Sequence, residues 1–435
     1  MLISSKITNG INGNVKIPGD KSISHRSIII PSISNGTSEI SNLLWSEDVL
    51  NTLNAFKAMG VEIEEDKKKV LINGKGLNSL VQSKHKINLG NSGTSARLLI
   101  GLLSSQNFDS TLVGDSSLSK RPMGRIIKPL ELMGAKFESN KNKLPLKIFG
   151  QKLKNINYEL ELPSAQVKSG LIFAALNTEG ISKIIEKNIT RDHTEIMLES
   201  FDANIKIDKI NYEKHISVSG KKELSSKDIS VPSDLSSAAF FIVAALINKS
   251  SHIKIDNINL NPTRDGILKA LDIMGGNIKI KNKRIINGEI IGDLEIKTSK
   301  LKGCELDYDF SRLMIDEYPI LSIAAAFADS PSLFKGLGEL KVKESDRLEL
   351  IRYNLDQCGI FCKVEGEDLY IDPTKKNDFK NNLIRTDYDH RIAMSFVVMG
   401  MKLGIDLKIM NSEFIKTSFP NFVESLNFIG GNLTE

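Results

Sequence analysis

The stretch Leu53-Asn54-Ala55-Phe56-Lys57-Ala58-Met59-Gly60-Val61-Glu62-Ile63 holds the pattern that decides the fold of this 435-residue chain. Apolar residues recur at helical spacing, a glycine follows, and an alternating apolar and polar run begins directly after it. A helix that ends at a glycine and leads into a strand produces this pattern. The pattern occurs at six junctions, which are Gly60, Gly134, Ala203, Gly275, Gly359 and Gly430.

The junctions recur at a nearly constant interval. Differences between neighbouring junction numbers are 74, 69, 72, 84 and 71 residues. Such a period predicts an internally repeated α/β protein whose unit holds several strands and two helices. The second helix of a unit is visible as an apolar stretch that we expect to pack inside, as at 96–103, 170–176, 238–247 and 393–401. The alternative is a set of unrelated helix–glycine–strand units in an ordinary doubly wound protein.

Six units favour two domains of three units each. Pro, Ser and Asp interrupt the pattern at Val231-Pro232-Ser233-Asp234, and Pro18-Gly19-Asp20 has the same character. If the chain crosses between domains at both places, residues 1–19 with 234–435 form one domain and residues 20–233 form the other. The first strand then belongs with the C-terminal half, and we expect Met1–Lys6 to form an edge strand. A hinge of two strands favours closure around a ligand.

The composition is typical of a globular protein from a reducing compartment. Hydrophobic residues make up 40% and charged residues 26% of the chain, enough for a large core. A net charge of +5 is too small to favour a nucleic-acid partner, and the basic run Lys67-Lys68-Lys69 is typical of a solvated turn. The cysteines Cys304, Cys358 and Cys362 are sparse and odd in number, and no apolar run reaches membrane-spanning length. We therefore expect a cytoplasmic protein without a zinc site.

Polar residues gather in turns that precede several repeat helices. A helix that begins near Ser22 would aim its free N–H groups, Lys21 and Arg26 at one anion. A capped helix with two solvated cations is the alternative. The glycine-rich turn Leu89–Arg97 offers Asn, Ser and Thr donors but carries neither a Walker lysine nor a dinucleotide fingerprint. Leu162–Gly170 enters an apolar helix in a similar way.

The second half adds carboxylates to this pattern. Asp316 precedes a long apolar helix, where an acid either favours the helix dipole or acts as a base. Lys343 and Arg347 are four residues apart and would share a helix face. Glu344 between them is an ion-pair partner or an acid–base group. Eight cations lie near the start of a repeat helix or in a turn before one, and we expect them to form a pocket for several negative charges: Lys21, Arg26, Arg121, Lys168, Arg191, Lys343, Arg347 and Arg391.

Seven motifs in order, PGDKSISHR, LGNSGTSARL, RPMGR, SAQVKSG, RDHTE, VKESDR and YDHRIAM, make the chain resemble the 5-enolpyruvylshikimate-3-phosphate synthases, or 3-phosphoshikimate 1-carboxyvinyltransferases. The resemblance implies a two-domain inside-out α/β barrel of six βαβαββ repeats, three per domain. It also implies transfer of the enolpyruvyl group of phosphoenolpyruvate to the 5-hydroxyl of shikimate-3-phosphate, without a metal or organic cofactor. The expected partners are these two small molecules, with no nucleic acid and no membrane, and the chain is expected to be a monomer.

The same resemblance assigns residues to each substrate. Shikimate-3-phosphate would be bound by Lys21, Ser22, Arg26, Ser164, Ala165, Gln166, Arg191, Asp316 and Lys343. Phosphoenolpyruvate would be bound by Lys21, Asn91, Gly93, Arg121, Gln166, Arg347 and Arg391. Asp316 matches the proton acceptor of the family, and either Lys21 or Glu344 would donate the proton.

Some positions depart from other members. SAQVKSG with RDHTE resembles the branch called class II, which tends to tolerate glyphosate, whereas Gly93 stands where a bulkier alanine crowds glyphosate out in some members. Ala165 replaces a serine, so one hydroxyl contact is lost or becomes a backbone contact. Lys416 is displaced by one place from the Lys-Thr-Phe-Pro run of some members and receives no role.

Two other functions compete with this interpretation. UDP-N-acetylglucosamine enolpyruvyl transferases share the repeat fold, but they typically use a cysteine in the first half, where this chain has none before Cys304. A noncatalytic small-anion-binding protein on the same scaffold is the other. The acids Asp316 and Glu344 argue against it, because a pure binder of anions has no need of them.

Overall fold

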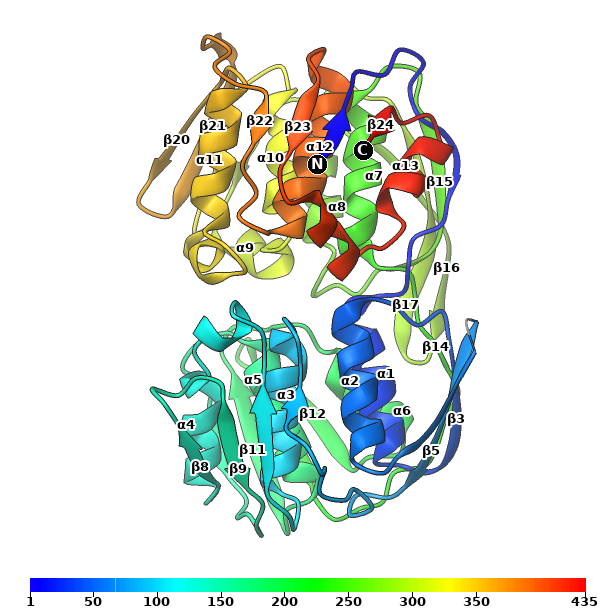
Figure 1. The fold of residues 1–435 in the computed structure, drawn as a ribbon, viewed down its shortest axis with the longest axis vertical. Coiled ribbons are helices and arrows are strands. Elements are labelled where there is room, and N and C mark those ends of the chain that lie inside the picture. Colours follow the sequence, from blue (N-terminus) through cyan, green and yellow to red (C-terminus); the bar gives the residue numbers. More distant parts are fainter. Residues whose placement is uncertain (67) are drawn as a thin grey trace. The chain divides into compact units, whose positions relative to one another are not determined.

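The computed structural model describes residues 1–66 and 68–435, so Lys67 in the predicted turn lies outside the described residues. The chain divides into two compact units (Figure 1). The first unit comprises Met1–Pro18, Pro232–Ile285 and Ile290–Glu435, and the second comprises Gly19–Val231 and Ile286–Glu289. The divisions after Pro18 and Val231 fall at the predicted crossings. The assignment of Ile286–Glu289 to the second unit had no signal in the sequence.

Three four-stranded sheets make up the strands of the second unit, in the orders β14-β3-β5-β4, β6-β7-β9-β8 and β10-β11-β13-β12. Each begins with a parallel pair, namely β14 with β3, β6 with β7 and β10 with β11. Their bounds are β3 Asn35–Ser41, β4 Glu62–Asp66, β5 Lys69–Lys75, β6 Ile87–Asn88, β7 Ser110–Val113, β8 Lys136–Ser139, β9 Leu146–Phe149, β10 Asn157–Glu159, β11 Ile181–Glu186, β12 Ile205–Ile210, β13 Glu213–Ser219 and β14 Ile229–Ser230.

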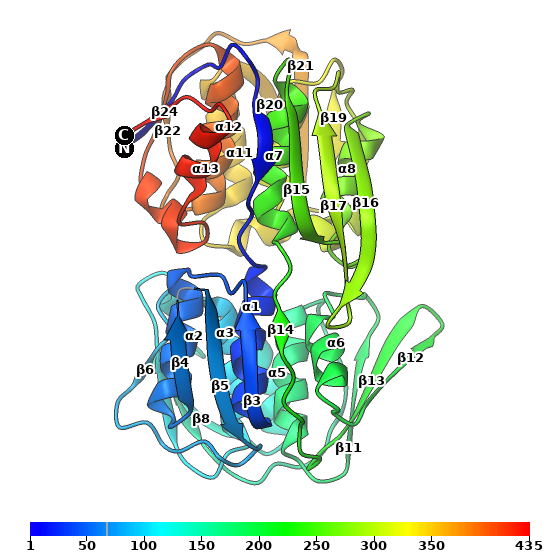
Figure 2. The same cartoon turned by 90° about the vertical axis from the view of Figure 1, so that its right-hand side faces the viewer.

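The first unit repeats this arrangement in the orders β2-β15-β17-β16, β18-β19-β21-β20 and β22-β23-β1-β24. In Figure 2 the strands β15, β17 and β16 lie side by side. The bounds are β1 Leu2–Ser4, β2 Asn12–Val15, β15 His252–Asn259, β16 Asn277–Ile286, β17 Glu289–Lys297, β18 Glu305–Leu306, β19 Ser332–Phe334, β20 Ile360–Glu365, β21 Asp368–Lys376, β22 Leu383–Ile384, β23 Leu407–Ile409 and β24 Leu433–Thr434.

The N-terminal strand β1 is not an edge strand, so that prediction was wrong. It pairs with β23 on one side and with the C-terminal strand β24 on the other, where Ile3 is opposite Thr434. The junction at Gly430 predicts a strand after it, but the sequence does not show which strand it pairs with; as β24 it covers the edge that β1 would otherwise present.

In the part of the chain that the structure describes, each unit has three helices inside and three that end at the repeat junctions. The buried ones are α1 Lys21–Ser32, α3 Gly93–Ser104 and α5 Ala165–Leu176 in the second unit, and α7 Leu235–Ile247, α10 Tyr318–Ala326 and α12 His390–Leu403 in the first. The others are α2 Glu47–Ala58, α4 Gly124–Leu132, α6 His193–Ser200, α8 Gly266–Ile273, α11 Arg347–Gln357 and α13 Phe422–Phe428, with α9 Tyr308–Met314 in addition. The four apolar stretches expected to pack inside fall in α3, α5, α7 and α12, which confirms them.

The buried helices pack directly on one another. In the first unit α7, α10 and α12 are in mutual contact (Figure 1). In the second unit α3 and α5 approach so closely that a Cβ on Gly101 would lie 1.9 Å from the carbonyl oxygen of Gly170. Glycine at this position is therefore a packing requirement, and it explains the Gly content of the predicted inner helices.

Five of the six predicted junctions are glycines with positive φ, from +79° at Gly359 to +110° at Gly430. The exception is the third, where the prediction placed the junction at Ala203. The left-handed residue there is Asp202, with φ 62°. Asp takes this conformation more easily than most residues with a Cβ, so a repeat without glycine keeps the same helix end one residue earlier.

Among the described residues, no helix has both the length and the apolarity to cross a membrane.

Candidate active site

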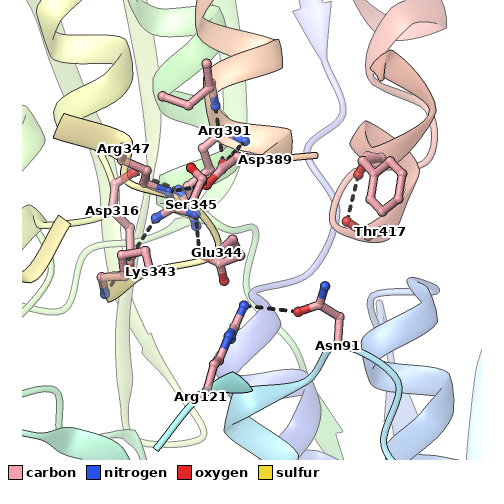
Figure 3. A network of polar contacts seen from close by, with 12 residues as sticks. Asn91, Arg121, Asp316, Lys343, Glu344, Ser345, Arg347, Asp389, Arg391 and Thr417 are labelled. Carbon is pink, nitrogen blue, oxygen red and sulfur yellow. Dashed lines mark hydrogen bonds and ion pairs between the residues drawn. The ribbon is translucent and has the colours of Figure 1, made fainter. Parts of the chain in front are cut away.

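Arg347 is the centre of a charged network in the first unit (Figure 3). It is the first residue of α11, and its side chain is 1% exposed. Nε donates to Asp389 at 2.8 Å, Nη2 to Glu344 at 2.6 Å and Nη1 to Asp316 at 3.3 Å. Burial lowers the pKa of Arg347, but the charges of the three carboxylates, led by Asp389, outweigh burial and hold it above its ordinary value.

Asp389 is fixed by the start of α12. Its Oδ1 accepts from the backbone N–H groups of Arg391 at 2.9 Å and Ile392 at 3.4 Å, so it is the N-cap of that helix. Its Oδ2 accepts from Arg347 and from the hydroxyl of Ser345 at 3.0 Å. One buried carboxylate thereby joins the start of α12 to that of α11.

Asp316 lies between α9 and α10 and faces two cations. Its Oδ1 is 3.2 Å from Nζ of Lys343 and 3.3 Å from Nη1 of Arg347. Its backbone oxygen accepts from Nη1 of Arg391 at 3.1 Å. Lys343 precedes α11 instead of belonging to it, so the expectation that Lys343 and Arg347 share a helix face was wrong. They meet at Asp316 because a turn, and not a helix, carries Lys343 there.

In the second unit, Lys21 and Ser22 are the first two residues of α1. An acid that received no role from the sequence, Asp48, lies beside Lys21. Asp20 caps the helix by accepting from the backbone N–H of Ile23 at 2.9 Å. Lys21 forms an ion pair with Asp48 in the first turn of α2, and its side chain is 25% exposed. A half-buried lysine at a helix start is positioned to meet an anion, and Asp48 holds it there.

Arg26, on the next turn of α1, is held by neutral groups. Nε donates to the hydroxyl of Thr194 at 2.6 Å, Nη2 to that of Ser169 at 2.9 Å and Nη1 to the carbonyl of Ser22 at 2.9 Å. It is 3% exposed, and burial lowers its pKa to about 10. The charges of Glu195 and Asp20 raise this pKa and that of Arg191 lowers it, but burial has the largest effect.

A second group of basic and amide side chains lies at the start of α3. Arg121 donates to Oδ1 of Asn91 at 3.0 Å, and Arg97 donates to Oε1 of Gln166 at 2.6 Å. A Cβ on Gly93 would lie 2.9 Å from Nη1 of Arg121 and 3.0 Å from Nη1 of Arg97. Glycine at this position therefore leaves room for two guanidinium groups. Arg97 received no role from the sequence, although its place in LGNSGTSARL, at helical spacing from Gly93, is a signal for one.

The start of α5 brings three of the predicted shikimate residues together. Ser164 is the N-cap, and its hydroxyl accepts from the backbone N–H of Val167 at 3.4 Å. Ala165 and Gln166 follow in the first turn, and Nε2 of Gln166 donates to Thr94 at 2.9 Å. The backbone oxygen of Ala165 also accepts from the hydroxyl of Ser169, which contacts Arg26, so this turn connects the Arg26 group to the Arg97 group.

Lys168 does not join the predicted cation pocket. Its side chain is fully buried, and Nζ lies 2.8 Å from Glu186 and 2.8 Å from Glu195. Burial lowers its pKa, but the charges of these carboxylates, Glu195 first, produce a net rise. Lys168 of SAQVKSG thus pairs with Glu195 of RDHTE, and the expectation that it faces an anionic ligand was wrong because two carboxylates already neutralise it.

Comparison with known proteins supports one family. A model of the family described as EPSP synthase (3-phosphoshikimate 1-carboxyvinyltransferase) matches residues 5–426. A 3-phosphoshikimate 1-carboxyvinyltransferase of Vesicomyosocius okutanii is 45% identical over 430 residues, covering 98% of this chain and 97% of the relative. One of Caldicellulosiruptor saccharolyticus is 46% identical over 419 residues, covering 96% of each.

Solved structures agree with the sequence relatives. An EPSP synthase from Acinetobacter baumannii aligns with a TM-score of 0.88 at 42% identity over 100% of both chains. The enolpyruvyl transferase NikO from Streptomyces tendae aligns with a TM-score of 0.77 at 15% identity, over 100% of this chain and 98% of that one. The second likeness shows the inside-out α/β fold alone.

Proposed function

The chain belongs to the EPSP synthase (3-phosphoshikimate 1-carboxyvinyltransferase) family, and from this premise we propose which of its residues carry the reaction. The protein transfers the enolpyruvyl group of phosphoenolpyruvate to the 5-hydroxyl of shikimate-3-phosphate and releases phosphate. The observation that carries the residue assignment is the carboxylate network around Arg347, because an anion-binding site alone would not place Asp316 and Glu344 among the cations.

We assign shikimate-3-phosphate to Arg26, Arg191 and the start of α5, together with Lys21, Ser22, Asp316 and Lys343. The substrate carries a phosphate and a carboxylate, and the cation Arg26 lies in the second turn of α1 while Arg191 precedes α6 by two residues. Ser164, Ala165 and Gln166 line the ring in this assignment, with a backbone contact at Ala165.

Phosphoenolpyruvate is assigned to Lys21, Asn91, Gly93, Arg121, Gln166, Arg347 and Arg391. Arginine suits this substrate because its planar fork matches carboxylate and phosphate oxygens. In the described structure Nη2 of Arg347 donates to Glu344. A substrate carboxylate at Arg347 competes with Glu344, and this releases the glutamate for proton transfer.

The chemistry requires one base and one acid. The 5-hydroxyl gives its proton to Asp316, its oxygen bonds C2 of phosphoenolpyruvate, and C3 gains a proton from Lys21 or Glu344, which yields a tetrahedral intermediate. C3 then returns a proton, the C2–O bond to phosphate breaks, and the enol ether forms. The fixed cations stabilise the phosphate as its charge increases.

Phosphate release from the two substrates tests the assignment. Asp316→Asn keeps an oxygen beside Lys343 and Arg347 but removes the base, so we expect kcat to fall by ~10²- to 10⁴-fold. Asp309→Asn is the matched control, since Asp309 is an exposed acid of α9 paired with Arg312. Near-full turnover of a folded Asp316→Asn enzyme would contradict the assignment of the base.

The rival functions are distinguished by the thiols and by turnover. Burial raises the pKa of Cys304 to about 11 and the pKa of Cys358 and Cys362 to about 12. Thiols with such a raised pKa stay protonated near neutral pH and are poor nucleophiles, which disfavours the cysteine chemistry of the UDP-N-acetylglucosamine enzymes. A noncatalytic anion binder would release no phosphate. We also propose that the enzyme acts as a monomer, which sedimentation equilibrium would test.

A further inference from the structure

The hydroxyls of Ser169 and Thr194 form a fork that faces Arg26. Their oxygens are 2.7 Å apart, and each accepts from a different nitrogen of the guanidinium, Nη2 at 2.9 Å and Nε at 2.6 Å. Nε and Nη2 form one edge of the guanidinium, the edge that commonly binds the two oxygens of a carboxylate. Here two alcohol oxygens, from α5 and α6, take the place of those carboxylate oxygens.

Both hydroxyl protons are used in hydrogen bonds to other groups, so both oxygens of the fork can accept from the arginine. Ser169 donates its proton to the carbonyl of Ala165 at 2.7 Å. A serine hydroxyl has a single proton, so Thr194 must be the donor in the contact between the two hydroxyls. Both oxygens therefore present lone pairs to Arg26, and neither competes as a donor.

The remaining contact of Arg26 ties its guanidinium to its own helix. Nη1 donates to the carbonyl of Ser22 on the same helix at 2.9 Å. A guanidinium has five N–H groups, and three are committed to these oxygens. One N–H on each terminal nitrogen remains and can donate to the oxygens of an anion.

A neutral anchor has a different consequence from an ionic one. A carboxylate in this position would fix the arginine equally well but would cancel most of its charge. The hydroxyl pair fixes the guanidinium plane and adds no negative charge of its own, so the place of a direct counter-ion is left to a ligand. Near Thr194, the neighbouring residues of α6 are also anchored, because His193 contacts Glu289 at 2.6 Å and Glu195 pairs with Lys168 at 2.8 Å. The first turn of α6 is thus anchored through three consecutive residues, His193, Thr194 and Glu195.

We infer that Ser169 and Thr194 are positioning residues for the anion of shikimate-3-phosphate, acting through Arg26 by fixing its orientation without neutralising it. The inference rests on the proposed role of Arg26 in binding this substrate. It gives a function to the serine of SAQVKSG and the threonine of RDHTE, neither of which contacts substrate in the assignment above.

Steady-state kinetics with both substrates tests the inference. Thr194→Val keeps the shape and removes the hydroxyl, and Ser169→Ala removes the other. Each should raise KM for shikimate-3-phosphate by ~10-fold, the loss of about one hydrogen bond to a charged group, and leave KM for phosphoenolpyruvate within about two-fold. Thr194→Ser retains the hydroxyl and should restore the wild-type KM. Thr178→Val is the matched control, since Thr178 is a buried threonine whose hydroxyl donates to Ala174 at 2.8 Å.

Arg26→Met separates the inference from the proposed function. It should raise KM for shikimate-3-phosphate at least as much as Thr194→Val, and Thr194→Val should add little in the Arg26→Met background because both act through one side chain. An unchanged KM in Arg26→Met would overturn the proposed role of Arg26. A raised KM in Arg26→Met with normal values in Thr194→Val and Ser169→Ala would overturn the positioning role alone. So would equal increases of both KM values, or a Thr194→Ser variant as impaired as Thr194→Val. If Thr194→Val does not fold, Ser169→Ala decides the question.

Discussion

Arg26 and Arg347 are both buried arginines in the first two turns of a repeat helix, one in each unit, yet their surroundings are opposite. Arg347 donates to three carboxylates, whereas each of the three contacts of Arg26 is a neutral oxygen. Accordingly the pKa of Arg347 lies above its ordinary value, and burial lowers the pKa of Arg26 to about 10. The first arginine is paired directly with carboxylates, whereas the second makes no ion pair among the described residues and is only partly compensated by the charges of Glu195, Asp20 and Glu289.

These two environments indicate what each unit contributes to the reaction. Around Arg347 the chain supplies acids as well as cations, which proton transfer requires. Around Arg26 the direct contacts supply orientation and no charge, so the place of a direct counter-ion is left to a ligand. A buried charge without a partner costs stability, which is the reason to expect it only where function demands it. The comparison leads to three predictions about stability.

The largest expected effect separates the two arginines directly. Arg347→Met would leave Asp389 buried without its cation, so we expect the free energy of unfolding to fall by about 3–5 kcal/mol. Arg26→Met removes a charge that makes no ion pair among the described residues, and the hydroxyls of Ser169 and Thr194 keep their own contacts, so a loss of only about 1 kcal/mol is expected. Urea unfolding of both variants measures this. Equal losses would show that the two environments are energetically alike.

The second prediction concerns shikimate-3-phosphate as the direct counter-ion of Arg26. At ~100 times its Kd, shikimate-3-phosphate should stabilise the wild-type protein by about 2.7 kcal/mol. At the same concentration the Arg26→Met variant should gain only about 1 kcal/mol, because its affinity is lower. Unfolding with and without the ligand measures the gain. Thr178→Val serves as the control that keeps it, and a full gain in Arg26→Met would remove Arg26 from the binding site.

The smallest expected effect is on the pH dependence of stability and concerns His25, the neighbour of Arg26 on α1. Its Nδ1 is 2.8 Å from the hydroxyl of Thr52, and burial, with the charges of Lys21 and Arg26, lowers its pKa well below 6.5. The unfolded chain therefore binds a proton that the folded chain rejects, so stability falls as the pH drops below 6.5. Between about pH 7.5 and about pH 5.5 this group should cost about 1.4 kcal/mol.

His25→Asn should remove that part of the pH dependence. The control is His85→Asn, because His85 is exposed. The measured quantity is the difference in unfolding free energy between the two pH values. An identical difference in wild type and His25→Asn would mean that His25 is not held neutral in the second unit.

Much of the fold was predictable because its cause is local. A helix end with positive φ selects glycine, so five of the six junctions could be located from residue type and spacing alone. The left-handed residue Asp202 was not located, because an aspartate can adopt this conformation but its presence in a sequence does not mark it. The edge position of β1 was mispredicted because pairing with β24 joins the two ends of the chain, and no local pattern reports such a contact.

By itself, the sequence determined the repeat, the two groups of three units and the motifs that carry charge to the helix starts. Periodicity and turn chemistry are properties of neighbouring residues, so a linear chain displays them. Only the tertiary structure decided which charges meet. Lys168 and Arg26 are both basic residues of conspicuous motifs, yet one is enclosed by two carboxylates and the other by two hydroxyls. Those partners come from helices and strands far away in the sequence, and ionic compensation depends on distance in space.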